Sequence, residues 1–177
     1  MIFLSSAMFV ASVVNEGVNQ GIDTVQSTVT FSLSANVENL TLAGGLSVEG
    51  IGNSLDNVIR GNSGNNRIDG KAGADTLIGG AGDDTYVITG TDGDIVVEQQ
   101  AEGNDTIITD LSYTLPDNVE NLEVTGNYSF KITSTGNSLN NVIKGRASYS
   151  NDVRSMADRL ICRLRRCTPR RTPRGIY

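Results

Sequence analysis

Residues 52–87 read GNSLDNVIR, GNSGNNRID, GKAGADTLI and GGAGDDTYV, four successive nine-residue units that each begin with glycine. The first six positions of each unit are rich in Gly, Asn and Asp, which tolerate positive φ and favour tight turns. Position eight is apolar in every unit, as Ile59, Ile68, Leu77 and Tyr86. The pattern therefore predicts a turn followed by a short strand, four times over.

The unbroken nine-residue period favours a parallel β-solenoid in which each unit forms half of one coil. In such a fold the apolar side chains at position eight stack on the inside as a continuous core, which no single unit could bury alone. We therefore expect an all-β fold, a right-handed parallel β-roll or β-solenoid.

The Gly-Gly-x-Gly-x-Asp-x-apolar-x pattern of the units resembles the RTX, or haemolysin-type, repeat. The resemblance implies that calcium lies between two turns stacked on one side of a β-roll, which places one site between 52–57 and 70–75 and another between 61–66 and 79–84. The sixth residue would supply a carboxylate and the glycine-rich backbone would expose carbonyl oxygens, the hard ligands that calcium prefers. The ligands that the resemblance implies are Asn57, Gly61, Ser63, Asn66, Gly70, Ala72, Asp75, Gly79, Ala81 and Asp84.

The array departs from the family pattern in its first two turns. Asn57 and Asn66 stand where the family prefers Asp, and Leu55 replaces a turn glycine. Each implied site then has one carboxylate, from Asp75 or Asp84, and a lower ligand charge predicts weaker calcium binding. The alternative is a metal-free solenoid in which Asn and Asp only stabilise the turns.

Further acidic residues lie in or beside the turns. Asp56 and Asp83 occupy the fifth position and Asp69 the ninth, where we expect them to raise the local negative potential without binding the ion. Asp92 and Asp94 belong to another glycine turn that is out of phase with the array by two residues, and they are weak candidates.

A longer repeat surrounds the array. Residues 14–44 align with 96–126 at a constant offset of 82, and 52–59 recurs as 136–143 at an offset of 84. The repeated segments alternate apolar and polar residues, which predicts half-buried strands. We interpret these spacers as further solenoid coils or as short hairpins packed against the array.

Glu38 and Glu120 recur in the two spacers, with Asn39 and Asn121 beside them. One acid in each module supplies no acid/base pair of the kind that glycosidases require. A structural role in a ladder or a turn is the interpretation that we favour.

These patterns divide the chain into six segments. We expect an apolar N-terminal segment at 1–13, a spacer at 14–51, the RTX β-roll at 52–95, a second spacer at 96–135, the start of a second repeat run at 136–145 and an Arg-rich tail at 146–177.

Charge changes abruptly along the chain. Residues 1–145 hold 5 Lys/Arg against 18 Asp/Glu, whereas 146–177 hold 9 Arg against 2 Asp. The tail is expected to be disordered, irregular or partly helical, with a helix possible over 152–165. Both cysteines, Cys162 and Cys167, lie in this tail, as free thiols or as one disulfide.

The first fourteen residues, MIFLSSAMFVASVV, are apolar but carry no positive charge at their start. A secretory signal, a strand and a non-native sequence at the edge of a fragment are the alternatives that we keep. The segment is too short to span a bilayer, so no stable membrane insertion is expected.

The composition also limits the function classes. The chain has no histidine, which excludes Ser-His, Cys-His and zincin centres, and no phosphate-binding loop occurs. An acidic body disfavours nucleic acid as a partner. We therefore expect a non-enzymatic protein that binds calcium and couples it to folding.

The family resemblance further implies an extracellular bacterial protein, exported by type I secretion. One alternative is a metal-independent structural or adhesive solenoid, a spacer of a surface protein or of a larger toxin or hydrolase, with cell-surface or matrix contacts. Another treats the Arg-rich tail as an arm that binds an anionic partner.

Overall fold

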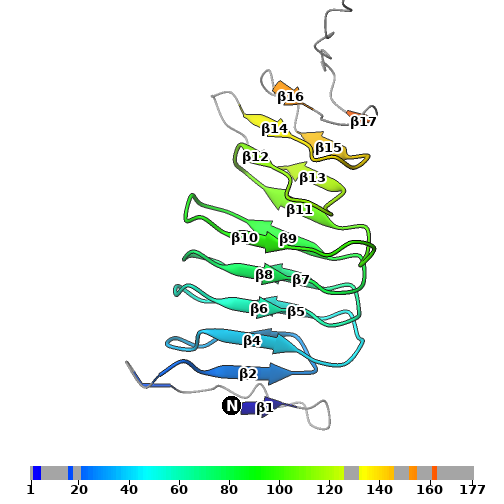
Figure 1. The fold of residues 1–177 in the computed structure, drawn as a ribbon. Coiled ribbons are helices and arrows are strands. Elements are labelled where there is room, and N and C mark those ends of the chain that lie inside the picture. Colours follow the sequence, from blue (N-terminus) through cyan, green and yellow to red (C-terminus); the bar gives the residue numbers. More distant parts are fainter. Residues whose placement is uncertain are drawn as a thin grey trace, which may run out of the picture.

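The computed structural model is a parallel β-solenoid of about six turns, whose coils stack along one axis (Figure 1). All strand pairs are parallel, from the N-terminal pair to the C-terminal one. Within the described residues, no helix is long and apolar enough to cross a membrane. The structure describes residues 2–4, 16–17, 21–125, 132–145, 152–154 and 161–162.

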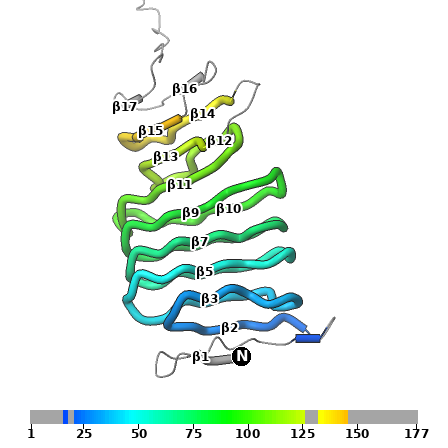
Figure 2. Tube along the Cα trace, turned by 180° about the vertical axis from the view of Figure 1, so that it is seen from behind, coloured from blue at the N-terminus to red at the C-terminus, as the bar shows by residue number. Residues whose placement is uncertain are grey.

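From β2 onward, successive strands alternate between two faces of the solenoid, and the view from behind shows β3, β5, β7 and β9 in order on one face (Figure 2). The first sheet contains β1 (Ile2–Leu4), β2 (Thr24–Ser27), β4 (Asn39–Leu42), β6 (Val58–Arg60), β8 (Thr76–Ile78) and β10 (Ile95–Val97). The second contains β3 (Phe31–Ser32), β5 (Glu49–Ile51), β7 (Arg67–Asp69), β9 (Thr85–Ile88), β11 (Thr106–Thr109), β13 (Asn121–Val124), β15 (Val142–Gly145) and β17 (Ile161–Cys162). The third contains β12 (Tyr113–Thr114), β14 (Thr133–Thr135) and β16 (Asp152–Arg154).

The core is a double stack of apolar side chains between the two faces. Ile59 and Leu77 stack in the first sheet and Ile68 and Tyr86 in the second, and all four are fully buried. The prediction that position eight points inward is therefore confirmed. Burying one such side chain stabilises a fold by about 1.5–3 kcal/mol, so the strands are held by their stack rather than by their length.

The spacers are coils of the same solenoid, not hairpins. Strand β4 pairs in parallel with β2 on one side and with β6 on the other, so the first spacer continues directly into the nonapeptide array. Strand β11 likewise continues from β9 into β13. Leu40 and Leu122, from the two spacers, are as deeply buried as the core residues of the array.

The two copies of the longer repeat lie on opposite faces. Val25 in β2 belongs to the first sheet, whereas its equivalent Ile107, 82 residues later in β11, belongs to the second. The strands β2 and β11 are nine strands apart, and nine is an odd number of half-coils. A strand of the second copy therefore lies on the face opposite to that of its equivalent in the first copy.

The expectation of a helix over 152–165 is wrong where the structure describes that segment. Asp152–Arg154 forms β16 on the edge of β14, and Ile161–Cys162 forms β17 on the edge of β15. An open parallel edge offers backbone hydrogen bonds that the weak helical pattern does not outweigh. The rest of that predicted helix lies outside the residues that the structure describes. The same holds for Cys167 and for the side chain of Cys162, so the prediction of free thiols or one disulfide stays a prediction.

Candidate metal centre

The sixth residues of the turns form a hydrogen-bonded ladder across successive coils. On the first-sheet side, the N–H of Asn57 donates to Oδ1 of Asp75 at 2.8 Å. The N–H of Asp75 donates in turn to Oδ1 of Asp94 at 3.1 Å. Asp94 thus joins the ladder although its turn is out of phase with the array. It follows Asp75 by 19 residues instead of 18, and the coil between them accommodates the one additional residue. Asp92 lies outside the ladder on an exposed turn.

A second ladder runs on the other side of the solenoid. The N–H of Asn66 donates to Oδ1 of Asp84 at 2.7 Å, and the N–H of Asp84 donates to Oδ1 of Asp105 at 2.8 Å. The N–H of Asp105 then donates to Oε2 of Glu120 at 2.8 Å. Carboxylates from the array and from the second spacer therefore belong to one continuous hydrogen-bonded ladder.

Asparagine closes the first two turns of the array. Oδ1 of Asn57 accepts the N–H of Asn53 at 2.8 Å, and its Nδ2 donates to two carbonyl oxygens of the preceding coil. Oδ1 of Asn66 accepts the N–H of Asn62 in the same way, at 2.7 Å. Turn stabilisation accounts for both buried amides, and their role as metal ligands stays a prediction.

The third and fourth turns have a different backbone. Their second and fourth positions adopt left-handed φ: 76° at Lys71 and 116° at Gly73, then 89° at Gly80 and 115° at Gly82. Only glycine adopts this conformation without a steric cost, so Gly73, Gly80 and Gly82 are required by the turn itself. Lysine occupies one such position against its intrinsic preference.

The aspartates of these two turns each keep an oxygen without a partner. Asp75 and Asp84 are at most 1% exposed, and Oδ1 of each accepts a backbone N–H from the preceding coil. Oδ2 of each is buried with no hydrogen-bond partner, and neither residue has a cationic partner among the described residues. A buried, unpaired carboxylate oxygen is costly and is normally matched by a cation or a donor.

The space between turns 18 residues apart is lined by oxygen atoms. A Cβ on Gly52 would collide with the carbonyl oxygen of Gly70 and lie 2.5 Å from Oδ1 of Asn57, and one on Gly61 would collide with the carbonyl oxygen of Gly79. Such a donor set, carbonyl and carboxylate oxygens without nitrogen or sulfur, fits calcium. The third-position candidates lie exposed at the turn tips: Ser63, Ala72 and Ala81.

Burial perturbs the protonation of the turn carboxylates. It raises the pKa of Asp75 to about 6, and the Asp94 carboxylate contributes to the rise against the opposing hydrogen bond from the backbone. It raises the pKa of Asp84 to about 7, with Asp105 contributing in the same way. Both pKa values rise because the carboxylates are buried next to other carboxylates and no cationic side chain of the described residues lies beside them.

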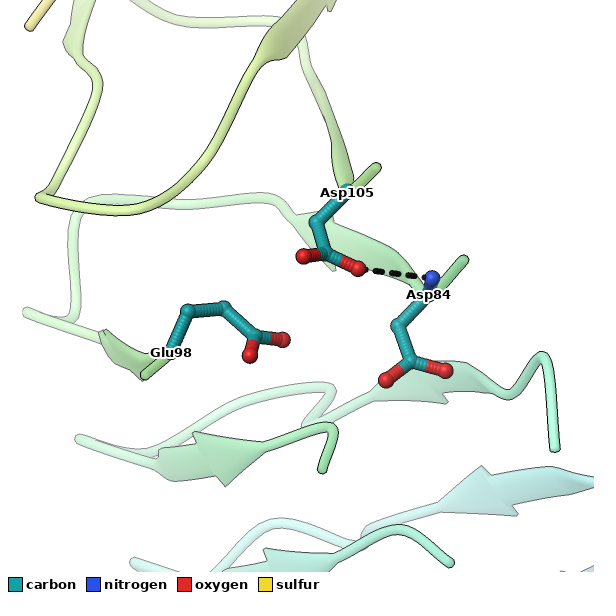
Figure 3. A group of neighbouring side chains, drawn as sticks. All are labelled: Asp84, Glu98 and Asp105. Carbon is teal, nitrogen blue, oxygen red and sulfur yellow. Dashed lines mark hydrogen bonds between the residues drawn. The ribbon is translucent and has the colours of Figure 1, made fainter. Parts of the chain in front are cut away.

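One group of carboxylates is closer than the others. Asp84, Glu98 and Asp105 are all buried, and one oxygen of each lies within 4.8 Å of the others (Figure 3). Asp84 comes from the last array turn, Glu98 follows β10, and Asp105 precedes β11. The hydroxyl of Tyr86 donates to Oε1 of Glu98.

Sequence reasoning missed Glu98 and Asp105 as candidate ligands and gave Asp94 little weight. A signal was present for the first two, because Glu16 and Asp23 stand at the same positions of the first spacer. Recurrence alone did not place them next to Asp84. Their proximity depends on the 21-residue separation between Asp84 and Asp105, which no nine-residue period predicts.

The remaining acids have structural contacts. Glu38 accepts the N–H of Asp23 at 2.9 Å through Oε2, as Glu120 does for Asp105, which supports the ladder role expected of both glutamates. The fifth-position Asp56 accepts the N–H of Ala74 at 2.8 Å, in the next coil. Two other expected non-ligands also have partners: Asp83 accepts from Asn104, and Asp69 pairs with Lys71 at 2.9 Å.

Fold and site together define a class: a parallel β-solenoid whose glycine turns carry buried carboxylates suited to a hard cation. Residues 51–86 match the family of RTX calcium-binding nonapeptide repeats, in four copies. This stretch is therefore an RTX array, and RTX nonapeptide repeats bind calcium.

A second comparison extends the likeness. A segment of 48 residues is 54% identical to endo-1,3-1,4-beta-glycanase ExsH of Rhizobium meliloti (strain 1021). The match covers 27% of this chain and only 10% of that protein. No solved structure matches the chain significantly.

Proposed function

We propose that the RTX turns of this protein bind calcium at Asp75 and Asp84 and that this binding completes the fold of an exported repeat module. The observation that carries the proposal is the buried Oδ2 atom of each aspartate, which has no hydrogen-bond partner. Asp75 would act with the 52–57 turn, and Asp84 with the 61–66 turn, through the oxygens that line the space between them.

The chain supplies negative charge that opposes its own folding. Two buried aspartates with raised pKa values face further carboxylates and have no cationic partner among the described residues. A bound divalent cation would neutralise them and join adjacent coils. Because such a site exists only in the folded chain, binding free energy adds to folding free energy, about 2.7 kcal/mol at a hundredfold excess over Kd.

The proposed location is extracellular. RTX proteins are typically secreted by type I secretion, and calcium is abundant outside the cell but scarce in the cytosol. The turns with Asn57 and Asn66 reduce the ligand charge, so their sites are expected to be weak and to stay empty in the cytosol. The chain would then be loose before export and rigid after it.

Circular dichroism of the full chain, with and without millimolar calcium, tests this function. We expect calcium to increase the β signal and the melting temperature, and the double variant Asp75→Asn/Asp84→Asn to lose most of that response. The control is Asp83→Asn, which removes a charge next to Asp84 while keeping an oxygen for the Asn104 N–H. A wild-type spectrum and melting temperature that do not respond to calcium would contradict the proposal.

The glycanase likeness favours a second, compatible function for the segment. We infer that this chain carries no catalytic centre and serves as the RTX portion of a larger hydrolase, because the match spans only a tenth of ExsH and RTX repeats are structural rather than catalytic. Incubation with a 1,3-1,4-β-glycan should release no reducing ends. Release that a Glu120→Gln variant abolished would instead show an active centre in the second spacer.

A further inference from the structure

The array ends at a group of three carboxylates, of which Asp84 belongs to the last nonapeptide unit and the other two follow the array. We propose that Asp84, Glu98 and Asp105 form an additional calcium site at the junction between the RTX array and the second spacer. The choice of calcium as the ion rests on the proposed function. The site itself rests on Glu98 and Asp105, which follow the array, together with Asp84 from its last turn.

The three side chains converge on one buried point. One oxygen of each lies within 4.8 Å of the others, and Figure 3 shows the carboxylates of Asp84 and Glu98 directed toward each other. Asp84 is 1% exposed, Glu98 7% and Asp105 1%, so no bulk water separates them. Calcium takes six to eight oxygen ligands, and the three carboxylates would supply part of that set.

Two of these oxygens have no other partner. Oδ2 of Asp84 and Oε2 of Glu98 are buried and accept no hydrogen bond. The other oxygens are accounted for: Oδ1 of Asp84 accepts from Asn66, and Oε1 of Glu98 accepts from the Tyr86 hydroxyl. Asp84 and Glu98 are thus each held in place by one oxygen while the second is left for a ligand.

The group packs against the backbone of Gly79. A Cβ on Gly79 would collide with Oδ2 of Asp84 and with the Tyr86 hydroxyl, and would lie 2.6 Å from Oε1 of Glu98. Only glycine at the first position of the fourth unit therefore allows these side chains to converge next to the backbone.

The electrostatics agree with the geometry. Burial raises the pKa of Glu98 to about 8, and Asp105 and Asp84 add to the rise against the hydrogen bond from Tyr86. Burial also raises the pKa of Asp105 to about 6. Without a cation, these carboxylates repel one another in a site from which water is excluded.

The junction site differs from the array sites in origin. Asp84 and Asp105 are 21 residues apart rather than 18, and Glu98 enters from the end of β10 on the first sheet. Glu16 and Asp23 stand 82 positions before Glu98 and Asp105, respectively, in the first copy of the module. A protein built from more copies of this module would form one such site wherever a nonapeptide run leads into a spacer.

Calcium titration of the full chain by isothermal titration calorimetry tests the proposal. We expect Glu98→Gln and Asp105→Asn each to lose one calcium per chain, or to weaken that site at least about tenfold, because ligand charge sets affinity. Asp75→Asn should leave the junction site intact. The control Glu102→Gln removes a neighbouring carboxylate that adds to the pKa rise at all three members of the group without belonging to it, and should bind as wild type.

Melting temperatures give a second readout that does not depend on counting sites. In EGTA, Glu98→Gln should melt higher than wild type because it removes repulsion, yet it should gain less from added calcium. A purely structural role for Glu98 would lower the melting temperature in both conditions, and that result would overturn the proposal.

The outcomes separate this inference from the proposed function. Wild-type affinity and stoichiometry in both Glu98→Gln and Asp105→Asn would overturn the junction site alone. Loss of calcium in these variants but not in Asp75→Asn or Asn66→Ala would support the junction site and refute binding by the array. A wild-type chain that binds no calcium would refute both.

Discussion

Asparagine and aspartate at the sixth turn position differ by one polar group, yet they stand in two kinds of turn. The amide of Asn57 both accepts from its own turn and donates to the preceding coil, so it closes the turn without help. The carboxylate of Asp75 cannot donate, and its second oxygen is left without a partner. Turns with asparagine are self-sufficient, whereas turns with aspartate leave a buried charge that the calcium ion of our proposal would compensate.

Glycine at the fourth turn position is sensitive to substitution for two reasons, its backbone conformation and the close approach of the neighbouring turn. Gly82 has a φ of 115°, and an added Cβ would lie 2.8 Å from the backbone carbon of Gly64. We expect Gly82→Ala to lower the free energy of unfolding by more than about 2 kcal/mol, since strain and collision act together. Chemical denaturation measures this loss.

Gly93→Ala is the matched control for that variant. Gly93 also has a positive φ, of 97°, but no atom lies within 4 Å of an added Cβ. The Gly93→Ala variant should lose only the free energy of unfolding that comes from backbone strain, about 1 kcal/mol. Equal losses in the two variants would show that the close approach of neighbouring turns contributes nothing.

At the scale of elements, the strands are too short to be stable alone. Strands of the array contain three or four residues, and each is held by parallel neighbours above and below. The first sheet stops at β10 and the third begins at β12, next to the segment 90–94 whose phase differs from that of the array. The second sheet continues past this break, which keeps the two parts of the solenoid joined.

Truncation of one inward side chain should disrupt the stack. Leu77 in β8 is fully buried between the first-sheet strands β6 and β10. Leu77→Ala is expected to cost about 2–5 kcal/mol, because lost burial adds to the cavity left behind. Ile95→Ala, at a position 58% exposed in β10, should cost under about 1 kcal/mol in the same denaturation experiment. A loss at Ile95 as large as that at Leu77 would contradict the inward stacking.

At the scale of the whole molecule, stability is a sum of coils and of the contacts between neighbours. Buried turn carboxylates form two ladders on opposite sides of the solenoid, with Asp75 and Asp94 in one and Asp84 and Asp105 in the other. The same acidic chain that favours cations disfavours its own compact state. Calcium and protons are then alternative means of neutralising the same groups. Both should therefore stabilise the fold, and each should add less stability where the other has already neutralised the carboxylates.

The pH dependence follows from the raised pKa values of Asp84, at about 7, and Glu98, at about 8. A carboxyl group with a higher pKa in the folded state binds protons more tightly there, so it stabilises the fold below its unfolded pKa and loses this effect as pH rises. We expect the calcium-free chain to melt progressively lower between about pH 4 and pH 8. The calcium-induced rise in melting temperature should be larger at pH 8 than at pH 5.

Thermal melts in EGTA and in calcium at several pH values measure both effects. The double variant Asp84→Asn/Glu98→Gln serves as the control and should flatten the calcium-free profile, because amides do not titrate. A calcium-free melting temperature that rises from pH 5 to pH 8 would contradict the assignment of uncompensated carboxylates.

The nine-residue period by itself determined the all-β parallel solenoid, the inward residues Ile59, Ile68, Leu77 and Tyr86, and the presence of calcium-binding repeats. These features depend on local chemistry, since turn residues and apolar residues recur at fixed positions in the chain. The likeness of the two spacers was equally visible, and so was the structural character of Glu38.

Tertiary structure alone decided which face each copy occupies and which acids meet. The second spacer follows the first by an odd number of half-coils, so Ile107 faces opposite to Val25. The longer coil at the junction brings Asp105 and Glu98 to Asp84. The length of the coils outside the array determines both the face of each spacer and the meeting of these three acids. No local sequence pattern encodes this length, because loops of different length can connect strands that stack in the same way.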